Sequence, residues 1–236
     1  MGSPLPLVLI GGTLCDDALW QPMLHAAPAL AAHARILAYS RYRSAQEAVR
    51  DLLPDLPGRF AVAGFSLGGF LALEMMAQAP ERVAGLALIA TNARADAPAN
   101  AQARRQAAVD AKREGVAAYV RRVLWPSYVA PGRLDDDALM SCILAMARRV
   151  GADTFGRQAD IAVLRADSLP RLADVRVPTL IVSGEADLLN PADRQQEMAD
   201  RMPDARWVRL PQVGHFVPLE APAALAAAVR QWTAGL

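Results

Sequence analysis

A serine stands between two closely spaced glycines in the segment VAGFSLGGF, residues 62–70. One apolar run ends here and another begins, so Ser66 is predicted to lie on a sharp turn between a strand and a helix. Such a turn strains the serine backbone and leaves no room for side chains two residues away, which explains Gly64 and Gly68. A hydroxyl exposed on this turn is a candidate nucleophile.

A serine hydroxyl is a weak nucleophile unless a base takes its proton and an acid orients that base. Two later loops offer such groups: Asp187 follows the apolar run VPTLIVSG, and His215 follows ARWVRLP. Because ligands bind at the carboxyl ends of parallel strands, we expect Ser66, Asp187 and His215 to meet at one edge of a sheet. Glu185 and Asp193 are the alternatives for the acid.

Acyl transfer also needs donors for the negative oxygen that forms in the transition state. The helix beginning at Leu67 directs its first amides toward the region beside the serine, so the Leu67 amide is one predicted donor. The other should come from the loop IGGTLCD, whose paired glycines allow close backbone approach. There we choose the Thr13 amide, with Leu14 next, and interpret Cys15 as a small buried filler and not as a catalytic thiol.

The secondary structure that must position these residues can be predicted, because short apolar runs alternate with helix-length segments along the chain. The runs predicted to be strands span 5–10, 34–40, 59–66, 83–92, 177–184 and 205–211. The segments predicted to be helices span 17–32, 44–53, 67–78, 191–202 and 222–232. This alternation is typical of an α/β fold with a mainly parallel sheet flanked by helices.

One stretch interrupts the alternation. Between Thr91 and Asp167 there is no strand signal, and we expect a helical insertion between two strands of the same sheet. Its helical segments are predicted at 100–114, 116–125, 135–150 and 153–164. The insertion carries 12 basic and 8 acidic side chains. We interpret these charges as solvated helix faces, with attraction of an anionic substrate or acyl carrier as the alternative.

The chain resembles the α/β-hydrolases in the segments IGGTLCD, GFSLGG, GEADLLNP and VGHFVPLEAP, which follow one another from the first strand to the last helix. The resemblance implies a sheet of about six to eight strands, with residues 1–91 and 167–236 forming the core. It implies that residues 92–166 form a helical cap over the active site. It also supports Asp187 as the acid. Gly11 stands where the family often carries a histidine.

We therefore expect a cofactor-independent serine hydrolase, without a metal, that cleaves a carboxylic ester or lactone through an acyl-enzyme on Ser66. Pockets are commonly lined by apolar and aromatic side chains, so Leu14, Trp125 and Tyr128 are the predicted substrate pocket. The alternatives are a C–C bond hydrolase, an acyltransferase, a perhydrolase, or a module that binds a ligand without turning it over.

Composition excludes several other classes. The 236 residues are 53% hydrophobic and 21% charged with a net charge of +1, which indicates a globular protein with no affinity for nucleic acid or membrane surfaces. Cys15 and Cys142 are too few for a disulfide framework, so we expect reduced thiols in the cytoplasm. No apolar window reaches membrane-spanning length, and no signal peptide is indicated. The expected partner is a small molecule, and the oligomeric state is left open.

Overall fold

The computed structural model of the chain describes residues 5–236, so residues 1–4 of the predicted core lie outside the described residues. Its centre is one six-stranded sheet in the order β2-β1-β3-β4-β5-β6, and all five pairings are parallel. The strands are β1 (Leu7–Ile10), β2 (Ala34–Ile36), β3 (Phe60–Phe65), β4 (Val83–Ile89), β5 (Thr179–Gly184) and β6 (Ala205–Leu210). The predicted α/β fold with a mainly parallel sheet is confirmed.

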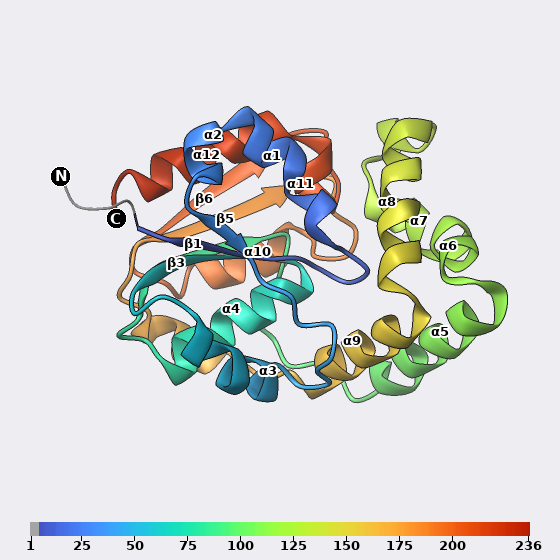
Figure 1. Cartoon of the computed structure of the whole chain (residues 1–236), viewed down its shortest axis with the longest axis horizontal. Coiled ribbons are helices and arrows are strands. Elements are labelled where there is room, and N and C mark those ends of the chain that lie inside the picture. The colour runs from blue at the N-terminus through green and yellow to red at the C-terminus, as the bar shows by residue number, and fades with distance from the viewer. Residues whose placement is uncertain (1–4) are drawn as a thin grey trace.

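Helices cover both faces of this sheet (Figure 1). One face carries α1 (Gln21–Ala26), α2 (Pro28–Ala31), α11 (Val217–Glu220) and α12 (Pro222–Thr233). The other carries α3 (Ala45–Leu52), α4 (Leu67–Gln78) and α10 (Ala192–Ala199). Successive residues of a strand point to opposite faces, so Leu7 and Leu9 enter one core cluster while Val8 and Ile10 enter the other.

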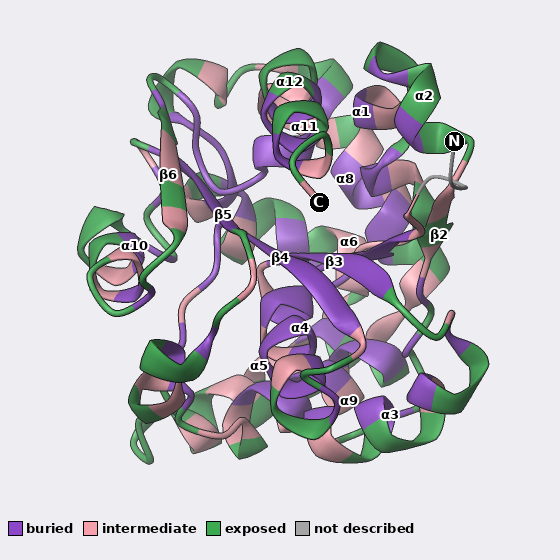
Figure 2. Cartoon of the chain, turned by 90° about the vertical axis from the view of Figure 1, so that its left-hand side faces the viewer, coloured by how far each residue is buried: buried purple, intermediate pink, exposed green. Residues whose placement is uncertain are grey.

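The four central strands are buried along their whole length, whereas the edge strands β2 and β6 are partly exposed (Figure 2). Burial on both faces explains why the central strands are continuous apolar runs with no alternating polar residues. At the edge, the predicted strand 34–40 is shorter than expected, since only Ala34–Ile36 pairs with β1.

The helical insertion lies between β4 and β5 in the chain and to one side of the sheet in space (Figure 1). It consists of α5 (Asn100–Glu114), α6 (Val116–Tyr119), a π-helical turn (Val120–Leu124), α7 (Trp125–Tyr128), α8 (Asp137–Val150) and α9 (Ala152–Leu164). Its two ends meet, because the Ser168 amide donates to the Ala93 carbonyl at 2.8 Å. The division into a core and a cap at residues 92–166 stays a prediction.

The predicted helix 17–32 is wrong in one respect, since the structure divides it into three pieces. A 3-10 turn (Asp17–Leu19) precedes α1, and α2 begins at Pro28. Proline pushes the residue before it out of the helical region, and Ala27 accordingly has φ −140° and ψ 74°.

No helix in the described part of the chain is long and apolar enough to cross a membrane. Both Cys15 and Cys142 are free thiols.

Candidate active site

Ser66 lies on the turn between β3 and α4, with φ 52° and ψ −115°. Positive φ is unfavourable for a residue with a side chain, so the surroundings must hold this conformation in place. The Ser66 amide donates to the Ile89 carbonyl at 2.9 Å, and its carbonyl accepts from Thr91 Oγ1 at 2.7 Å. A Cβ added at Gly64 would overlap the Gly68 carbonyl, which is the steric reason for the glycine spacing.

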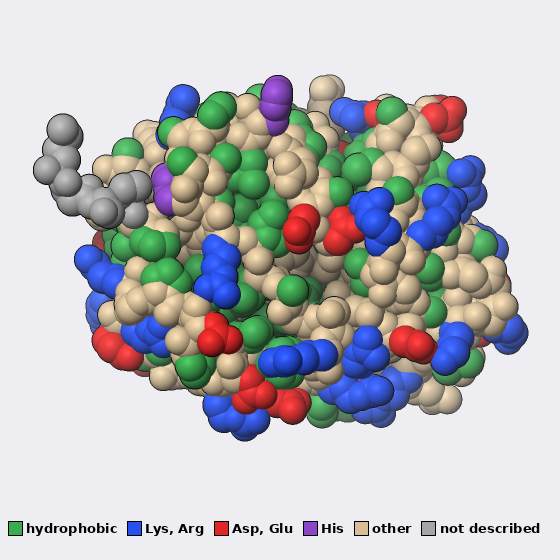
Figure 3. Space-filling model, viewed as in Figure 1, with side chains coloured by type: hydrophobic (Ala, Val, Ile, Leu, Met, Phe, Trp, Pro, Cys, Tyr) green, Lys and Arg blue, Asp and Glu red, His purple; other side chains and the backbone are tan. Residues whose placement is uncertain are grey.

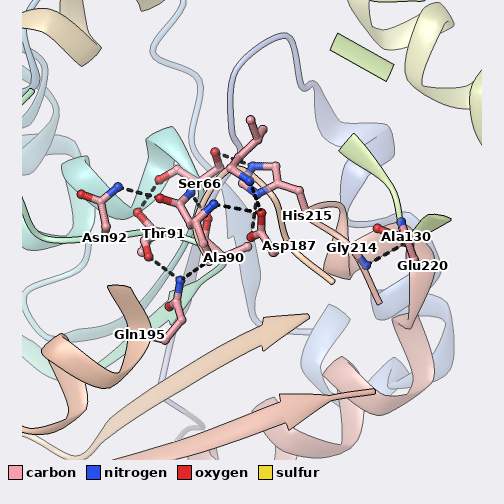
Figure 4. Close-up of polar contacts among 12 residues, drawn as sticks. Ser66, Ala90, Thr91, Asn92, Ala130, Asp187, Gln195, Gly214, His215 and Glu220 are labelled. Atoms are coloured by element: carbon pink, nitrogen blue, oxygen red, sulfur yellow. Dashed lines mark hydrogen bonds and ion pairs between the residues drawn. The ribbon is translucent and has the colours of Figure 1, made fainter. Parts of the chain in front are cut away.

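The structure brings Ser66, His215 and Asp187 together from three loops at one end of the sheet (Figure 4). Ser66 Oγ lies 2.9 Å from His215 Nε2, and His215 Nδ1 lies 2.9 Å from Asp187 Oδ2. The Asp187 and His215 side chains are buried. The alternative acids Glu185 and Asp193 are exposed, so the geometry selects Asp187 as the partner of the imidazole.

The second carboxylate oxygen of Asp187 is also occupied. Oδ1 accepts from the amides of Leu189 at 2.8 Å and Asn190 at 2.9 Å. The Asn190 side chain in turn donates to the Ala90 carbonyl at 2.9 Å, which joins the acid-bearing turn to the end of β4. These contacts occupy Oδ1 and fix the direction in which Oδ2 faces the histidine.

The loop that carries His215 is held by the helical insertion. The amides of His215 and of the next residue both donate to the Tyr128 carbonyl at 3.1 Å. Behind them, Glu220 Oε2 accepts from the amides of Ala130 at 2.9 Å and Gly214 at 3.0 Å (Figure 4). Burial raises the pKa of Glu220, although the two amides act in the opposite direction. The insertion therefore contributes directly to the position of the imidazole.

Three aromatic rings surround that imidazole. The ring of Phe65 lies 5.2 Å from His215 between centroids, Tyr128 lies stacked at 6.3 Å, and Phe216 meets it edge-on at 6.0 Å. Such rings exclude water from the histidine and restrict its rotation, while leaving both ring nitrogens to their partners.

The loop after β1 also reaches the serine, since a Cβ added at Gly12 would lie 3.0 Å from Ser66 Cβ. The Thr13 and Leu67 residues line the cavity beside Ser66, and neither amide donates to an acceptor among the described residues. The Leu14 amide, the second choice for an oxyanion donor, is occupied: it donates to Gln158 Oε1 at 2.9 Å. Leu14 has φ 58°, so this loop is also in a strained conformation.

A cavity of about 260 Å³ opens beside the serine, between the sheet and the insertion. Of the three predicted pocket residues, only Tyr128 lines it. The prediction for Leu14 is wrong because its side chain is buried in the core cluster beneath the loop. The prediction for Trp125 is wrong because its indole is buried within the insertion, where its N–H donates to the Leu134 carbonyl at 3.1 Å.

Sequence reasoning missed most of the cavity wall. One face of α9 contributes Phe155, Gln158, Ala159 and Ala162, a spacing of three and four residues that is typical of one buried helix face. That periodicity was available in the sequence, but it does not show what the face contacts. Other lining residues have no local sequence signal; they are Phe70, Asn92, Arg104, Ala107, Leu124, Arg165 and Leu189.

Comparison with known proteins identifies the family of the chain. Residues 7–228 match the model of the alpha/beta hydrolase family. The chain belongs to the alpha/beta hydrolase family. Within residues 5–236, no group of three or more His, Cys, Asp or Glu side chains is arranged to hold a metal ion.

Relatives within this family carry several activities in their names. The chain is 31% identical over 187 residues to the pimeloyl-acyl-carrier-protein methyl ester esterase of Aromatoleum aromaticum, covering 72% of each chain. It is 28% identical over 263 residues to BpoC of Mycobacterium tuberculosis, named as a non-heme bromoperoxidase, covering 100% of this chain and 96% of that one. Among solved structures, a thermophilic esterase from Thermogutta terrifontis superposes with a TM-score of 0.88 at 24% identity, covering 100% of this chain and 91% of the other.

Proposed function

We propose that this member of the family is a serine hydrolase that cleaves a carboxylic ester or lactone through an acyl-enzyme on Ser66. The observation that supports it is the pair of 2.9 Å contacts that join Ser66 Oγ to His215 Nε2 and His215 Nδ1 to Asp187 Oδ2. A nucleophile, a base and an orienting acid within hydrogen-bond reach of one another are what acyl transfer requires.

In this mechanism His215 Nε2 takes the hydroxyl proton while Ser66 Oγ attacks the substrate carbonyl carbon. The carbonyl oxygen becomes an oxyanion and accepts hydrogen bonds from the amides of Thr13 and Leu67, each worth about 3–4 kcal/mol in comparable sites. His215 then protonates the leaving alkoxide, and the ester bond breaks. Water, deprotonated by the same nitrogen, attacks the acyl-enzyme, and His215 gives that proton to Ser66 Oγ as the acid leaves. Asp187 stabilises the imidazolium in both halves of the cycle.

The cavity supports a small acyl substrate. Its volume of about 260 Å³ lies below the range of about 300–1,000 Å³ usual for drug-sized ligands. We propose that the insertion acts as a cap that covers this cavity and that Tyr128 forms part of the pocket. No step in the cycle calls for a cofactor, and the ester specificity named for the Aromatoleum aromaticum relative fits the same chemistry.

The test is covalent labelling with a fluorophosphonate, followed by intact mass and peptide mapping. We expect one adduct, on Ser66, with labelling abolished in Ser66→Ala and slowed sharply in His215→Ala. His25→Ala is the matched control, since His25 is exposed on α1 and should label like the wild type. Turnover of short acyl esters and lactones should be lost in the same variants. An unlabelled wild-type protein would favour the module that binds a ligand without turnover.

The main alternative within the family is that a molecule other than water accepts the acyl group. The similarity to BpoC, which covers 100% of this chain, favours testing hydrogen peroxide as that acceptor. The acyl-enzyme would be the same, and only the attacking nucleophile would differ. Product analysis with water, an alcohol and hydrogen peroxide in competition separates a hydrolase from an acyltransferase or a perhydrolase. We expect the free acid to dominate.

A further inference from the structure

The charged side chains of the cavity wall are of one sign. Arg104 and Arg165 both line the cavity that holds Ser66, and no acidic side chain does so among the described lining residues. Arg165 is largely buried, with 8% of its side chain exposed, and Arg104 is 40% exposed. The two guanidinium groups therefore extend from the cavity wall to a more open position.

Both arginines pair with the same carboxylate, that of Asp96. The side chain of Asp96 is only 3% exposed and does not line the cavity. It accepts from Arg104 Nε at 2.6 Å and Nη2 at 3.1 Å, and it lies 3.2 Å from Arg165 Nη2. Two cations share one carboxylate, so the cluster retains a net positive charge toward the cavity. Burial opposes ionisation of Asp96, but the hydrogen bonds from Arg104 and Asn100 hold its pKa below the usual value.

The cluster is held in place and still has unused donors. Arg165 donates to the carbonyls of Arg94 and Ala162 at 2.7 Å each, and its guanidinium lies 4.6 Å from the ring centre of Phe70. Arg104 uses Nε and Nη2 on Asp96, which leaves its Nη1 group without an acceptor among the described residues. A fixed guanidinium with free N–H groups is well suited to a carboxylate.

Resting on the proposed function, we propose that Arg104 and Arg165 form an anion subsite for the acyl part of the substrate, which therefore carries a free carboxylate. The substrate class is the monoester, or the lactone, of a dicarboxylic acid. Ser66 attacks the ester end while the arginines bind the far carboxylate. Because Arg165 is largely buried, charge pairing there gains more than it would on an open surface.

The rest of the insertion shows why this pair differs from ordinary surface charge. Basic and acidic side chains lie side by side over the insertion (Figure 3). Lys112 pairs with Asp153, and Arg122 pairs with Glu114, one cation to one anion. Asp160 is likewise shared by two arginines, Arg43 and Arg105, but neither of them lines the cavity. Within residues 5–236, the arginines that share Asp96 are the ones that also line the cavity.

The experiment compares the monomethyl and dimethyl esters of the same dicarboxylic acid, for a series from succinic to suberic acid. We expect wild-type kcat/KM to favour at least one monoanion over its neutral diester, and added salt to reduce that preference. Arg104→Gln should lower the preference about tenfold to a hundredfold, since hydrogen bonds to charged groups are worth about 1.5–3 kcal/mol. Arg105→Gln, next in α5 and outside the cavity, is the matched control and should keep the preference.

A second variant separates binding from folding. Asp96→Asn removes the shared counter-charge, so the preference for the monoanion should rise, whereas a merely structural ion pair would lose turnover of both esters equally. Calorimetry with the free dicarboxylate measures the subsite without turnover, so it remains informative if Ser66 is not a nucleophile. The subsite is overturned if the dicarboxylate fails to bind the wild type, or if Arg104→Gln and Arg105→Gln bind it equally.

Discussion

The backbone amide of Leu14 donates to Gln158 Oε1 at 2.9 Å, across 144 residues of sequence. This contact joins the loop after β1, which carries the proposed donor Thr13, to α9 of the insertion. Both partners are buried. The Leu14 backbone is strained at φ 58°, so the glutamine is a candidate for holding the loop in its observed form.

We therefore expect Gln158→Leu to reduce kcat on a neutral ester by about tenfold or more with little change in KM, because the loop that binds the oxyanion would lose its position. The buried Leu14 amide would also lose its acceptor, at a cost of about 1–3 kcal/mol in unfolding free energy. Gln106→Leu, exposed on α5, is the control. Steady-state kinetics and urea unfolding measure the two effects, and an unchanged kcat would contradict this role for Gln158.

Asp187→Asn should reduce kcat on the order of 10⁴-fold with the fold intact. Oδ1 must still accept from the amides of Leu189 and Asn190, so the new NH₂ group would face His215 Nδ1. A donor there forces the proton onto Nε2, which can then no longer accept from Ser66. Asp193→Asn, an exposed acid beside Arg194, should behave as the wild type in the same assays. Equal activity of the two variants would remove Asp187 from the mechanism.

The steric role of Gly68, two residues after Ser66, can be tested by measuring the stability of a variant. A Cβ added at Gly68 would overlap the carbonyls of Ile10 and Gly11, which belong to the backbone and cannot move aside easily. We expect Gly68→Ala to lower the unfolding free energy by about 1–3 kcal/mol and to abolish labelling of Ser66. Gly58→Ala is the control, since nothing lies within 4 Å of the added atom. Urea midpoints for the two variants should differ clearly.

The raised pKa of Glu220 predicts that the stability of the fold depends on pH. Its pKa is raised by burial, so the folded state binds the proton more tightly than the unfolded state does. The contribution to stability is therefore complete below the ordinary pKa of 4.5 and is lost as pH rises through the raised value. In Glu220→Gln this component should disappear from a series of urea midpoints taken from acid to neutral pH. A variant with the same slope as the wild type would argue against the assignment to Glu220.

Much of the fold could be predicted because its causes are local. Burial on both faces makes the central strands continuous apolar runs, and helix-length segments between them require parallel pairing. The spacing of Gly64, Ser66 and Gly68 reports a steric demand of one turn, so it also could be predicted from a few residues. The helix break at Ala27 was missed although Pro28 marks it, because proline is tolerated in a first helical turn.

The sequence by itself determined the order in which nucleophile, acid and base follow one another along the chain. It also determined the loops on which they lie. Only the tertiary structure decided how the insertion meets the sheet. In the tertiary structure, the Leu14 amide donates to Gln158, and Trp125 is buried away from the cavity. Arg104 and Arg165 line the cavity, and both contact Asp96. These contacts join residues far apart in sequence, and side-chain packing between separate elements leaves no periodicity or spacing from which they could be read.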